Sequence, residues 1–342
     1  MITPRERVLK MFRGERADRP AVQYLYVPVG LYEHGEKLND LFEKYPGDFE
    51  RFVRQPIPQP PDGTIDREGR YYEKQTDEWG VTQEYRVFGI MGHAIGFPIK
   101  TIGDAAHYSF PPLPDYFINP AQMAEDIAHH KKEYVSLGGG MPGLMQKLWH
   151  LRGFENTMMD MHDDSAEFNA LMDRLADYER TMVAALVAAD VDVICYGDDY
   201  GVQEGLMFSK ELFRHSIKPR LARIFEPAVK TGKYIHFHSC GRVIDLFDDF
   251  KELGVTSLWP QLPVYDMREL ADALRFYDFS LAIHTDRAFT MTHGRPTDVK
   301  ELVLLENEIF KPKDGKAWFY IEVDTGFPFE NIRQLVETVF AL

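Results

Sequence analysis

Two histidines and a cysteine near residue 240 are the side chains of this sequence best suited to hold a metal ion. The stretch 233–241 reads Lys-Tyr-Ile-His-Phe-His-Ser-Cys-Gly, and its apolar, aromatic first part predicts a short buried strand. Because side chains alternate along a strand, His236, His238 and Cys240 should point the same way. A His-x-Cys pair at the end of a strand suits a tetrahedral zinc ion. These two residues supply only half of a zinc site. The alternative interpretation of the pair is a buried structural histidine beside an inert thiol.

The elements around this stretch alternate between strand and helix. The strands are marked by apolar runs rather than by a period of two, which is typical of a parallel sheet covered by helices. We expect strands at residues 21–27, 133–137, 191–196, 234–238, 257–260, 280–284 and 317–322. About eight strand–helix units in one chain favour an α/β fold of the (β/α)8 TIM-barrel type over an open sheet.

One domain is expected over residues 1–342, with two additions to the barrel. Residues 1–20 form an N-terminal extension whose helix begins after Thr3, a favourable N-cap, with Pro4 at its first position. Residues 71–100 alternate in polarity and contain Gly89 and Gly92, which predicts an inserted β-hairpin beside the main sheet.

Composition excludes several classes of function. The net charge of −15 argues against a nucleic-acid partner. No apolar run is long enough to span a membrane, and the start of the sequence does not read as a signal peptide. The two cysteines, Cys195 and Cys240, do not make a disulfide framework, so we expect a cytoplasmic protein.

Polar residues follow most of the predicted strands. In a TIM barrel the carboxyl ends of the strands meet at one mouth, where the chemistry takes place. The residues that should converge there are Asp198, Asp199, Tyr200, His238, Cys240, Gln261, His284, Asp286, Glu322 and Asp324. Each could serve only as a turn or helix cap, and this is the role expected of Asp198.

Five segments of the chain resemble the uroporphyrinogen decarboxylase superfamily. They are Cys195–Gln203, Phe208–Arg214, Ile217–Arg220, His238–Arg242 and Pro328–Arg333. The resemblance covers most of the chain, is clearest in the second half, and implies a (β/α)8 barrel, in agreement with the strand–helix rhythm.

The resemblance also separates two branches of the superfamily. The true decarboxylases carry an arginine-rich N-terminal segment that grips the substrate's propionates, and the matching residues here, 22–30, contain no arginine. The other branch, the zinc-dependent methyltransferases linked to corrinoid proteins, is marked by His-x-Cys and a third ligand, usually cysteine, near the C-terminus. His238 and Cys240 match that mark. No late cysteine is present, and Glu322 falls near the third position, with Asp324 as the alternative.

This resemblance implies zinc held by His238, Cys240 and Glu322. A carboxylate in place of a thiolate makes the site harder and favours an oxygen ligand. The expected reaction is therefore an O-demethylation, in which a methyl group passes from a methoxylated aromatic small-molecule donor to cob(I)alamin. The corrinoid (cobalamin) signature Asp-x-His-x-x-Gly does not occur in the chain, so a partner corrinoid protein should supply it. A homodimer is compatible with this picture.

Further roles can be assigned at the predicted mouth. We expect Asp199 and His284 to be catalytic: Asp199 would support the ligands or handle a proton, and His284 would orient the leaving oxygen. The residues expected to bind substrate are Tyr24, Tyr26, Tyr200, Trp259 and Asp286. His236 is expected to be a satisfied core histidine. The competing functions are a methylcobamide:thiol methyltransferase of the coenzyme M type, a decarboxylase of a porphyrin-like acid, and a non-catalytic metal- or corrinoid-binding module.

Overall fold

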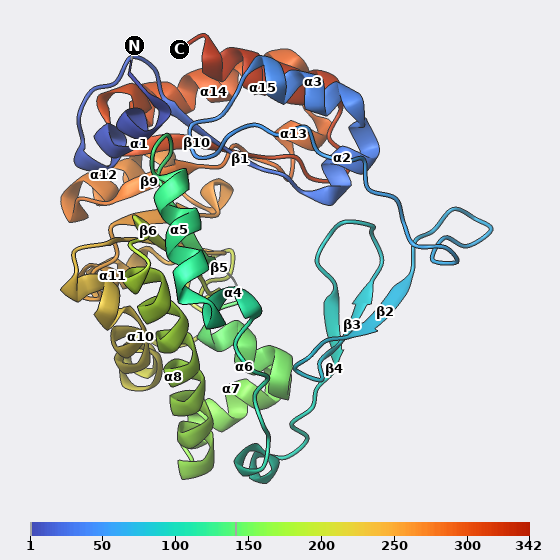
Figure 1. The fold of residues 1–342 in the computed structure, drawn as a ribbon, viewed down its shortest axis with the longest axis vertical. Helices are drawn as coiled ribbons and strands as arrows, with labels where there is room; N and C mark the ends of the chain where they lie inside the picture. The colour runs from blue at the N-terminus through green and yellow to red at the C-terminus, as the bar shows by residue number, and fades with distance from the viewer. Residues whose placement is uncertain (1, 141) are drawn as a thin grey trace.

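A curled parallel sheet forms the centre of the computed structural model, which describes residues 2–140 and 142–342 (Figure 1). In these residues the sheet has seven strands in the order β1-β10-β9-β8-β7-β6-β5. Their bounds are β1 Ala21–Leu25, β5 Leu137–Gly140, β6 Val193–Gly197, β7 Tyr234–Ser239, β8 Ser257–Pro260, β9 Ser280–Ile283 and β10 Ala317–Glu322. Every pairing within the sheet is parallel, so all the carboxyl ends lie at one edge.

The predicted fold class, an α/β fold of TIM-barrel type, is confirmed, and the sheet curls through about half of a barrel (Figure 1). An eighth parallel strand is absent from residues 2–140 and 142–342, because the chain between β1 and β5 forms helices, loops and a separate small sheet. The strand predicted at 133–137 begins later, at Leu137, and runs through three glycines. A Cβ at Gly139 would lie 2.2 Å from the carbonyl oxygen of Cys195, so this part of β5 is packed tightly against β6.

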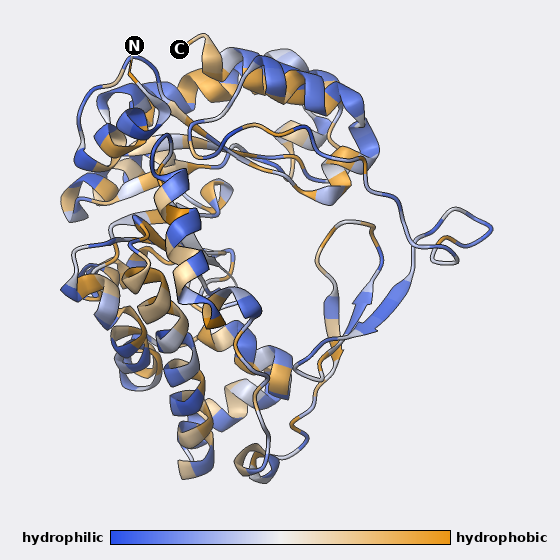
Figure 2. Ribbon diagram, in the orientation of Figure 1, coloured by the Kyte–Doolittle hydropathy of each residue, from blue (hydrophilic) through white to orange (hydrophobic). Residues whose placement is uncertain are grey.

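Helices cover the outer face of the sheet, where the apolar sides of strands and helices meet (Figure 2). Those after β5 are α6 Leu144–Arg152, α7 Phe154–Asp163, α8 Ala166–Ala188, α9 Lys210–Leu212, α10 Lys218–Lys230, α11 Phe247–Glu252, α12 Met267–Tyr277, α13 Thr290–His293, α14 Pro296–Phe310 and α15 Phe329–Phe340. Those before it are α1 Pro4–Arg13, α2 Pro28–His34, α3 Glu36–Lys44, α4 Asp115–Ile118 and α5 Pro120–His130. Within the described chain, the helices are all too short or too polar to cross a membrane.

Helix α1 closes the amino-terminal end of the curled sheet. Thr3 caps it as predicted, with its hydroxyl accepting from the Glu6 amide and the Glu6 carboxylate accepting from the Thr3 amide. The ring of Phe12 stacks on Tyr234 at a centroid distance of 4.5 Å and also contacts Trp318. The predicted N-terminal extension therefore works as a plug at the bottom of the sheet.

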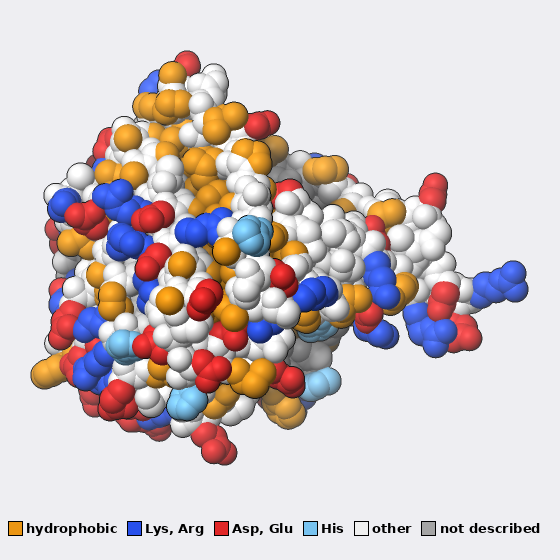
Figure 3. All heavy atoms as spheres, turned by 90° about the horizontal axis from the view of Figure 1, so that it is seen from below, with side chains coloured by type: hydrophobic (Ala, Val, Ile, Leu, Met, Phe, Trp, Pro, Cys, Tyr) orange, Lys and Arg blue, Asp and Glu red, His pale blue; other side chains and the backbone are white. Residues whose placement is uncertain are grey.

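The predicted hairpin insertion is a three-stranded antiparallel sheet in the order β2-β3-β4. Its strands are β2 Glu73–Thr76, β3 Thr82–Tyr85 and β4 His93–Gly96, so the third strand adds to the expected pair. The insert stands away from the main sheet in Figure 1. Figure 3, a view from below, shows it projecting to one side, with acidic and basic side chains interspersed over the whole face.

Candidate metal centre and active site

His238 is held in the orientation and the tautomer that a metal ligand requires. It is the interior residue nearest the carboxyl end of β7, between Gly197 of β6 and Trp259 of β8. Its Nδ1 donates to the carbonyl oxygen of Trp259 at 2.8 Å, so the lone pair is left on Nε2. Burial lowers the pKa of His238 to about 4, against the opposing effect of Asp199, so the ring is neutral at pH 7.

Cys240 lies beside that lone pair, with Sγ 3.5 Å from Nε2 of His238. The next residue, Gly241, has φ +72°, and a Cβ there would lie 2.1 Å from the backbone of Gly201. Two glycines therefore let the loops after β6 and β7 touch, and this contact fixes the backbone that carries Cys240. Burial raises the pKa of the Cys240 thiol to about 12, and Asp199 adds to the rise, so metal binding must displace a proton.

Asp199 completes a group of three potential ligand atoms, which lie within 4.8 Å of one another on Asp199, His238 and Cys240. Its Oδ1 accepts from the Cys240 amide at 2.7 Å and lies 3.6 Å from Nε2 of His238. Its Oδ2 accepts from the side chain of Gln146, in the first turn of α6, at 2.7 Å. Each carboxylate oxygen keeps a further lone pair after these bonds.

Glu322, the predicted third ligand, lies outside this group in the structure. Its carboxylate ends β10 and faces Arg287 at 3.7 Å and Nε2 of His284 at 3.8 Å. Asp324, the alternative ligand, lies 3.6 Å from the same Arg287 guanidinium. Both carboxylates thus face the Arg287 guanidinium, whereas Asp199 is the carboxylate that lies with His238 and Cys240. Burial raises the pKa of Glu322, and Arg287 opposes that rise.

His284 presents a buried proton to the mouth. Its Nδ1 accepts from the indole Nε1–H of Trp259 at 3.0 Å, so the proton of the neutral ring is on Nε2. Among the described residues this Nε2 has no hydrogen-bond partner. Burial lowers the pKa of His284 to about 3, so the ring stays neutral. His284 is therefore built as a hydrogen-bond donor rather than as a metal ligand.

A cavity of about 160 Å³ opens on these groups. The residues that line it include His238, Cys240, Trp259, Gln261, His284 and Arg287. The indole of Trp259 packs on the His238 ring at 4.1 Å and on Tyr320 at 4.4 Å. Trp259 thus forms one wall and also orients both histidines, through its carbonyl oxygen and its indole N–H.

Four predicted substrate contacts lie elsewhere or have another function, and these predictions are wrong for this structure. Tyr200 is fully buried, and its hydroxyl donates to Asp198 at 2.9 Å. Tyr24 and Tyr26 point outward and pack on Phe42 of α3. All four hydrogen bonds accepted by Asp286 come from residues 288–290, where it caps the start of α13. Tyr24 and Tyr26 lie on the outward face of the sheet at β1, and Tyr200 lies in the core. Their positions in the sequence alone did not distinguish these places from the mouth.

Two structural roles predicted from the sequence are confirmed. Asp198 accepts from the amides of Met145 and Gln146, and so caps α6. His236 is buried, bonds to the Ser257 hydroxyl at 3.0 Å and packs on Trp318. Burial lowers the pKa of His236 to about 3, as a neutral core histidine requires.

Arg287 and Gln146 were not expected at the mouth. Arg287 lies in the loop after β9, one residue beyond Asp286. Its place just after a predicted strand end is the sequence signal that could have indicated it. Gln146 lies in a helix and reaches Asp199 only through the cap that Asp198 makes. No local sequence signal links a helix side chain to an aspartate 53 residues away.

Comparison with protein families gives one match. The model of the uroporphyrinogen decarboxylase (URO-D) family matches residues 111–272, just under half of the chain. The range contains β5 to β8, Asp199, His238 and Cys240. The matched part of the chain, which holds these three residues, is therefore similar to the uroporphyrinogen decarboxylase family, as its sequence motifs indicated. No curated protein matches the sequence significantly.

Solved structures share the fold. A methyltransferase from Methanosarcina mazei aligns over 100% of this chain and 99% of its own, with a TM-score of 0.67 and 16% identity. A B12-independent methionine synthase from Shewanella sp. W3-18-1 covers 82% of this chain and 74% of its own, with a TM-score of 0.41 and 13% identity. The first likeness shows the same fold from end to end, and the second is too distant to support an argument.

Proposed function

We propose that this chain is a zinc-dependent methyltransferase that moves a methyl group from a methoxylated aromatic compound to cob(I)alamin on a partner corrinoid protein. The observation that carries the proposal is the lone pair of His238 Nε2 at the carboxyl end of β7, which accepts a long hydrogen bond from the Cys240 thiol, with Sγ at 3.5 Å. The superfamily match, and a fold shared with a methyltransferase, support the transfer of a methyl group.

The donor set fits zinc. His238, Cys240 and Asp199 offer one nitrogen, one sulfur and one oxygen, which is a common type of zinc environment, and a fourth position is left for substrate. The third donor is a carboxylate whether it is Asp199 or Glu322, so the site is harder than one with two thiolates. Zinc bound there would withdraw electron density from a methoxy oxygen and make it a better leaving group.

The other residues of the mouth suit the departure of an oxygen. The unpartnered Nε2–H of His284 can donate to the oxygen as negative charge develops on it. Arg287, on the cavity wall, can hold an acidic group of the substrate and keep it beside Glu322 and His284. Trp259 offers an aromatic surface to the substrate ring. Cob(I)alamin, the methyl acceptor, would approach from the open side with its own protein.

The test is methyl transfer by the purified, zinc-loaded protein. Cob(I)alamin is mixed with methoxyarenes, methylamines or thiol ethers, and methylation of the corrinoid is followed by absorbance. Activity with methoxyarenes that is lost in Cys240→Ser and kept in the surface variant His215→Ala is the expected result. If the protein instead methylates a thiol from methylcobalamin and leaves every methoxyarene untouched, the coenzyme M-like alternative replaces the proposal.

A further inference from the structure

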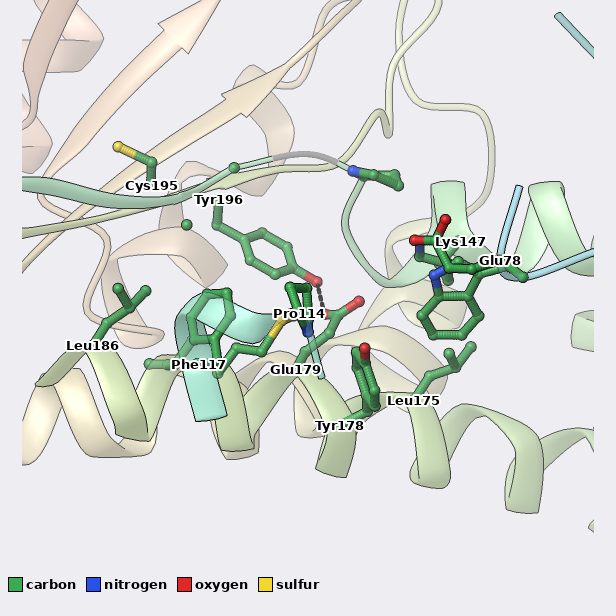
Figure 4. Close-up of a pocket in the computed structure, with 16 residues that line it drawn as sticks. Glu78, Pro114, Phe117, Lys147, Leu175, Tyr178, Glu179, Leu186, Cys195 and Tyr196 are labelled. Atoms are coloured by element: carbon green, nitrogen blue, oxygen red, sulfur yellow. Dashed lines mark hydrogen bonds between the residues drawn. The ribbon is translucent and has the colours of Figure 1, made fainter. Parts of the chain in front are cut away.

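A second, larger cavity lies between the β5–β6 edge of the sheet, helix α8 and the insert (Figure 4). Its volume is about 290 Å³, close to the lower limit for small-molecule sites. Most of its wall is apolar or aromatic, with Trp79, Phe117, Leu175, Tyr178 and Leu186 among the lining residues. It shares no lining residue with the cavity at the metal centre.

Glu179 of α8 brings a carboxyl group into this apolar wall. The Tyr196 hydroxyl accepts from the Leu144 amide at 2.8 Å and donates to Glu179 Oε2 at 2.6 Å, the bond drawn in Figure 4. The second oxygen, Oε1, is buried and has no hydrogen-bond partner in the described part of the chain. The Glu179 residue is 5% exposed. A buried acceptor without a donor is costly, so this oxygen needs a partner that the described residues do not supply.

Lys147 of α6 brings an amino group, a hydrogen-bond donor, to the same cavity. Its Nζ lies 4.2 Å from the centre of the Trp79 ring. Within residues 2–140 and 142–342 it forms no ion pair, although Glu179, Asp77 and Glu78 are close enough to attract its charge. Burial lowers the pKa of Lys147, whereas burial raises the pKa of Glu179 to about 8. Burial is the largest cause of both shifts, so the two groups lie in a poorly solvated space.

We propose that this cavity binds a small aromatic or apolar carboxylic acid that also carries a hydrogen-bond donor. The acid's carboxylate would pair with Lys147, its donor would bond to Glu179 Oε1, and its apolar body would lie on the Trp79, Tyr178 and Phe117 rings. One ligand would thus satisfy the two groups that the chain leaves unpaired. The site does not depend on the metal centre or on the proposed methyl transfer.

Three related probes test the ligand class on the unmodified protein by isothermal titration calorimetry. 4-Hydroxyphenylacetate has both groups, phenylacetate lacks the donor, and p-cresol lacks the carboxylate. Because p-cresol lacks the ion pair with Lys147 and phenylacetate lacks one hydrogen bond to a mostly neutral carboxyl group, p-cresol should bind about 10-fold and phenylacetate about 5-fold more weakly. Equal affinity for all three probes, or no binding of 4-hydroxyphenylacetate at millimolar concentration, would overturn the proposal.

Two variants locate the site. Lys147→Gln should abolish the advantage of 4-hydroxyphenylacetate over p-cresol. Glu179→Leu should abolish its advantage over phenylacetate, because leucine offers neither an acceptor nor a donor to the ligand's hydroxyl. The matched surface variants Lys132→Gln and Glu301→Leu should leave all three affinities unchanged.

A fifth variant, Arg287→Gln, distinguishes this cavity from the metal centre. Binding that is lost in Arg287→Gln and kept in Lys147→Gln would place the acid at the mouth and overturn the proposal. Circular dichroism establishes that each variant is folded, and the probe series on the unmodified protein decides the ligand class even if a variant does not fold.

Discussion

The two ends of the sheet use their charged residues in opposite ways. At the amino-terminal end, Asp48 is fully buried and is bonded to Arg7 at 2.6 Å, to Arg19 at 2.7 Å and to the Val22 amide at 2.9 Å. Nearby, Asp192 accepts from Arg5 at 2.6 Å and from the Ser136 amide at 3.0 Å. Because Arg5 and Arg7 belong to α1, these ion pairs fasten the plug to the sheet.

At the carboxyl end, the polar groups are held in place but have weak or missing hydrogen-bond and ion-pair partners in the described residues. His238 Nε2 accepts a long hydrogen bond from the Cys240 thiol, the Nε2–H of His284 has no partner in the described residues, and Arg287 lies more than 3.5 Å from both carboxylates it faces. The comparison teaches that satisfied charges at one end stabilise the fold that keeps unsatisfied groups at the other available for a ligand. Four experiments test this division between the two ends.

The largest effect is expected at the metal centre. His238→Ala or Cys240→Ser removes one donor of a small set, so zinc affinity should fall by about 100-fold or more, and methyl transfer should fall with it. Thermal unfolding of the metal-free proteins should change little. Zinc content after dialysis, measured by atomic emission, checks this, with His215→Ala as the surface control. Full zinc occupancy in both ligand variants would refute the site.

The next effect is expected at the opposite end. Asp48→Asn leaves the partly buried Arg19 without its carboxylate and Arg7 with Asp18 alone, which should cost about 3 kcal/mol of unfolding free energy. The zinc affinity of the protein that remains folded should be unchanged. Urea unfolding and zinc titration of the same sample measure both quantities. A stable variant with weakened zinc binding would contradict the separation of the two ends.

A smaller effect distinguishes the two candidate carboxylates. Asp199 lies in the donor group, so Asp199→Asn should weaken zinc binding by about 10- to 100-fold. Glu322→Gln should retain zinc and mainly reduce turnover, because Glu322 faces His284 and Arg287 instead. Competition with a chelator gives the affinities, and single-turnover methylation gives the rates. If Glu322→Gln loses zinc while Asp199→Asn keeps it, the ligand set first expected from the sequence is correct.

The smallest effect depends on pH. Burial raises the pKa of Asp192, but hydrogen bonds from Arg5 and Ser136 outweigh it and hold this pKa at about 2. A carboxyl whose pKa is lower in the folded than in the unfolded state stabilises the fold above about pH 4, and loses that effect as the pH falls towards 2. Asp192→Asn should therefore cost about 2 kcal/mol at pH 7 and almost nothing near pH 2. A constant difference in unfolding free energy across that range would exclude this linkage.

Much of the fold could be read from local patterns. The apolar runs at residues 191–196, 234–238 and 317–322 are strands in the structure, and Thr3 caps the first helix. The pairing of His238 with Cys240 also follows from neighbours in sequence, because alternation along one strand fixes their common side. These features depend on residues only a few positions apart, so the sequence was enough to predict them.

The composition of the site was decided by contacts between distant segments. Gln146 of α6 and the Cys240 amide hold Asp199 beside His238 and Cys240, while Glu322 faces Arg287. Which face of β1 carries Tyr24 depends on the register between β1 and β10, a pairing of residues almost 300 positions apart. A sequence states which side chains exist and how neighbours alternate, but the partners that orient a side chain come from other strands, and only the folded sheet brings them together.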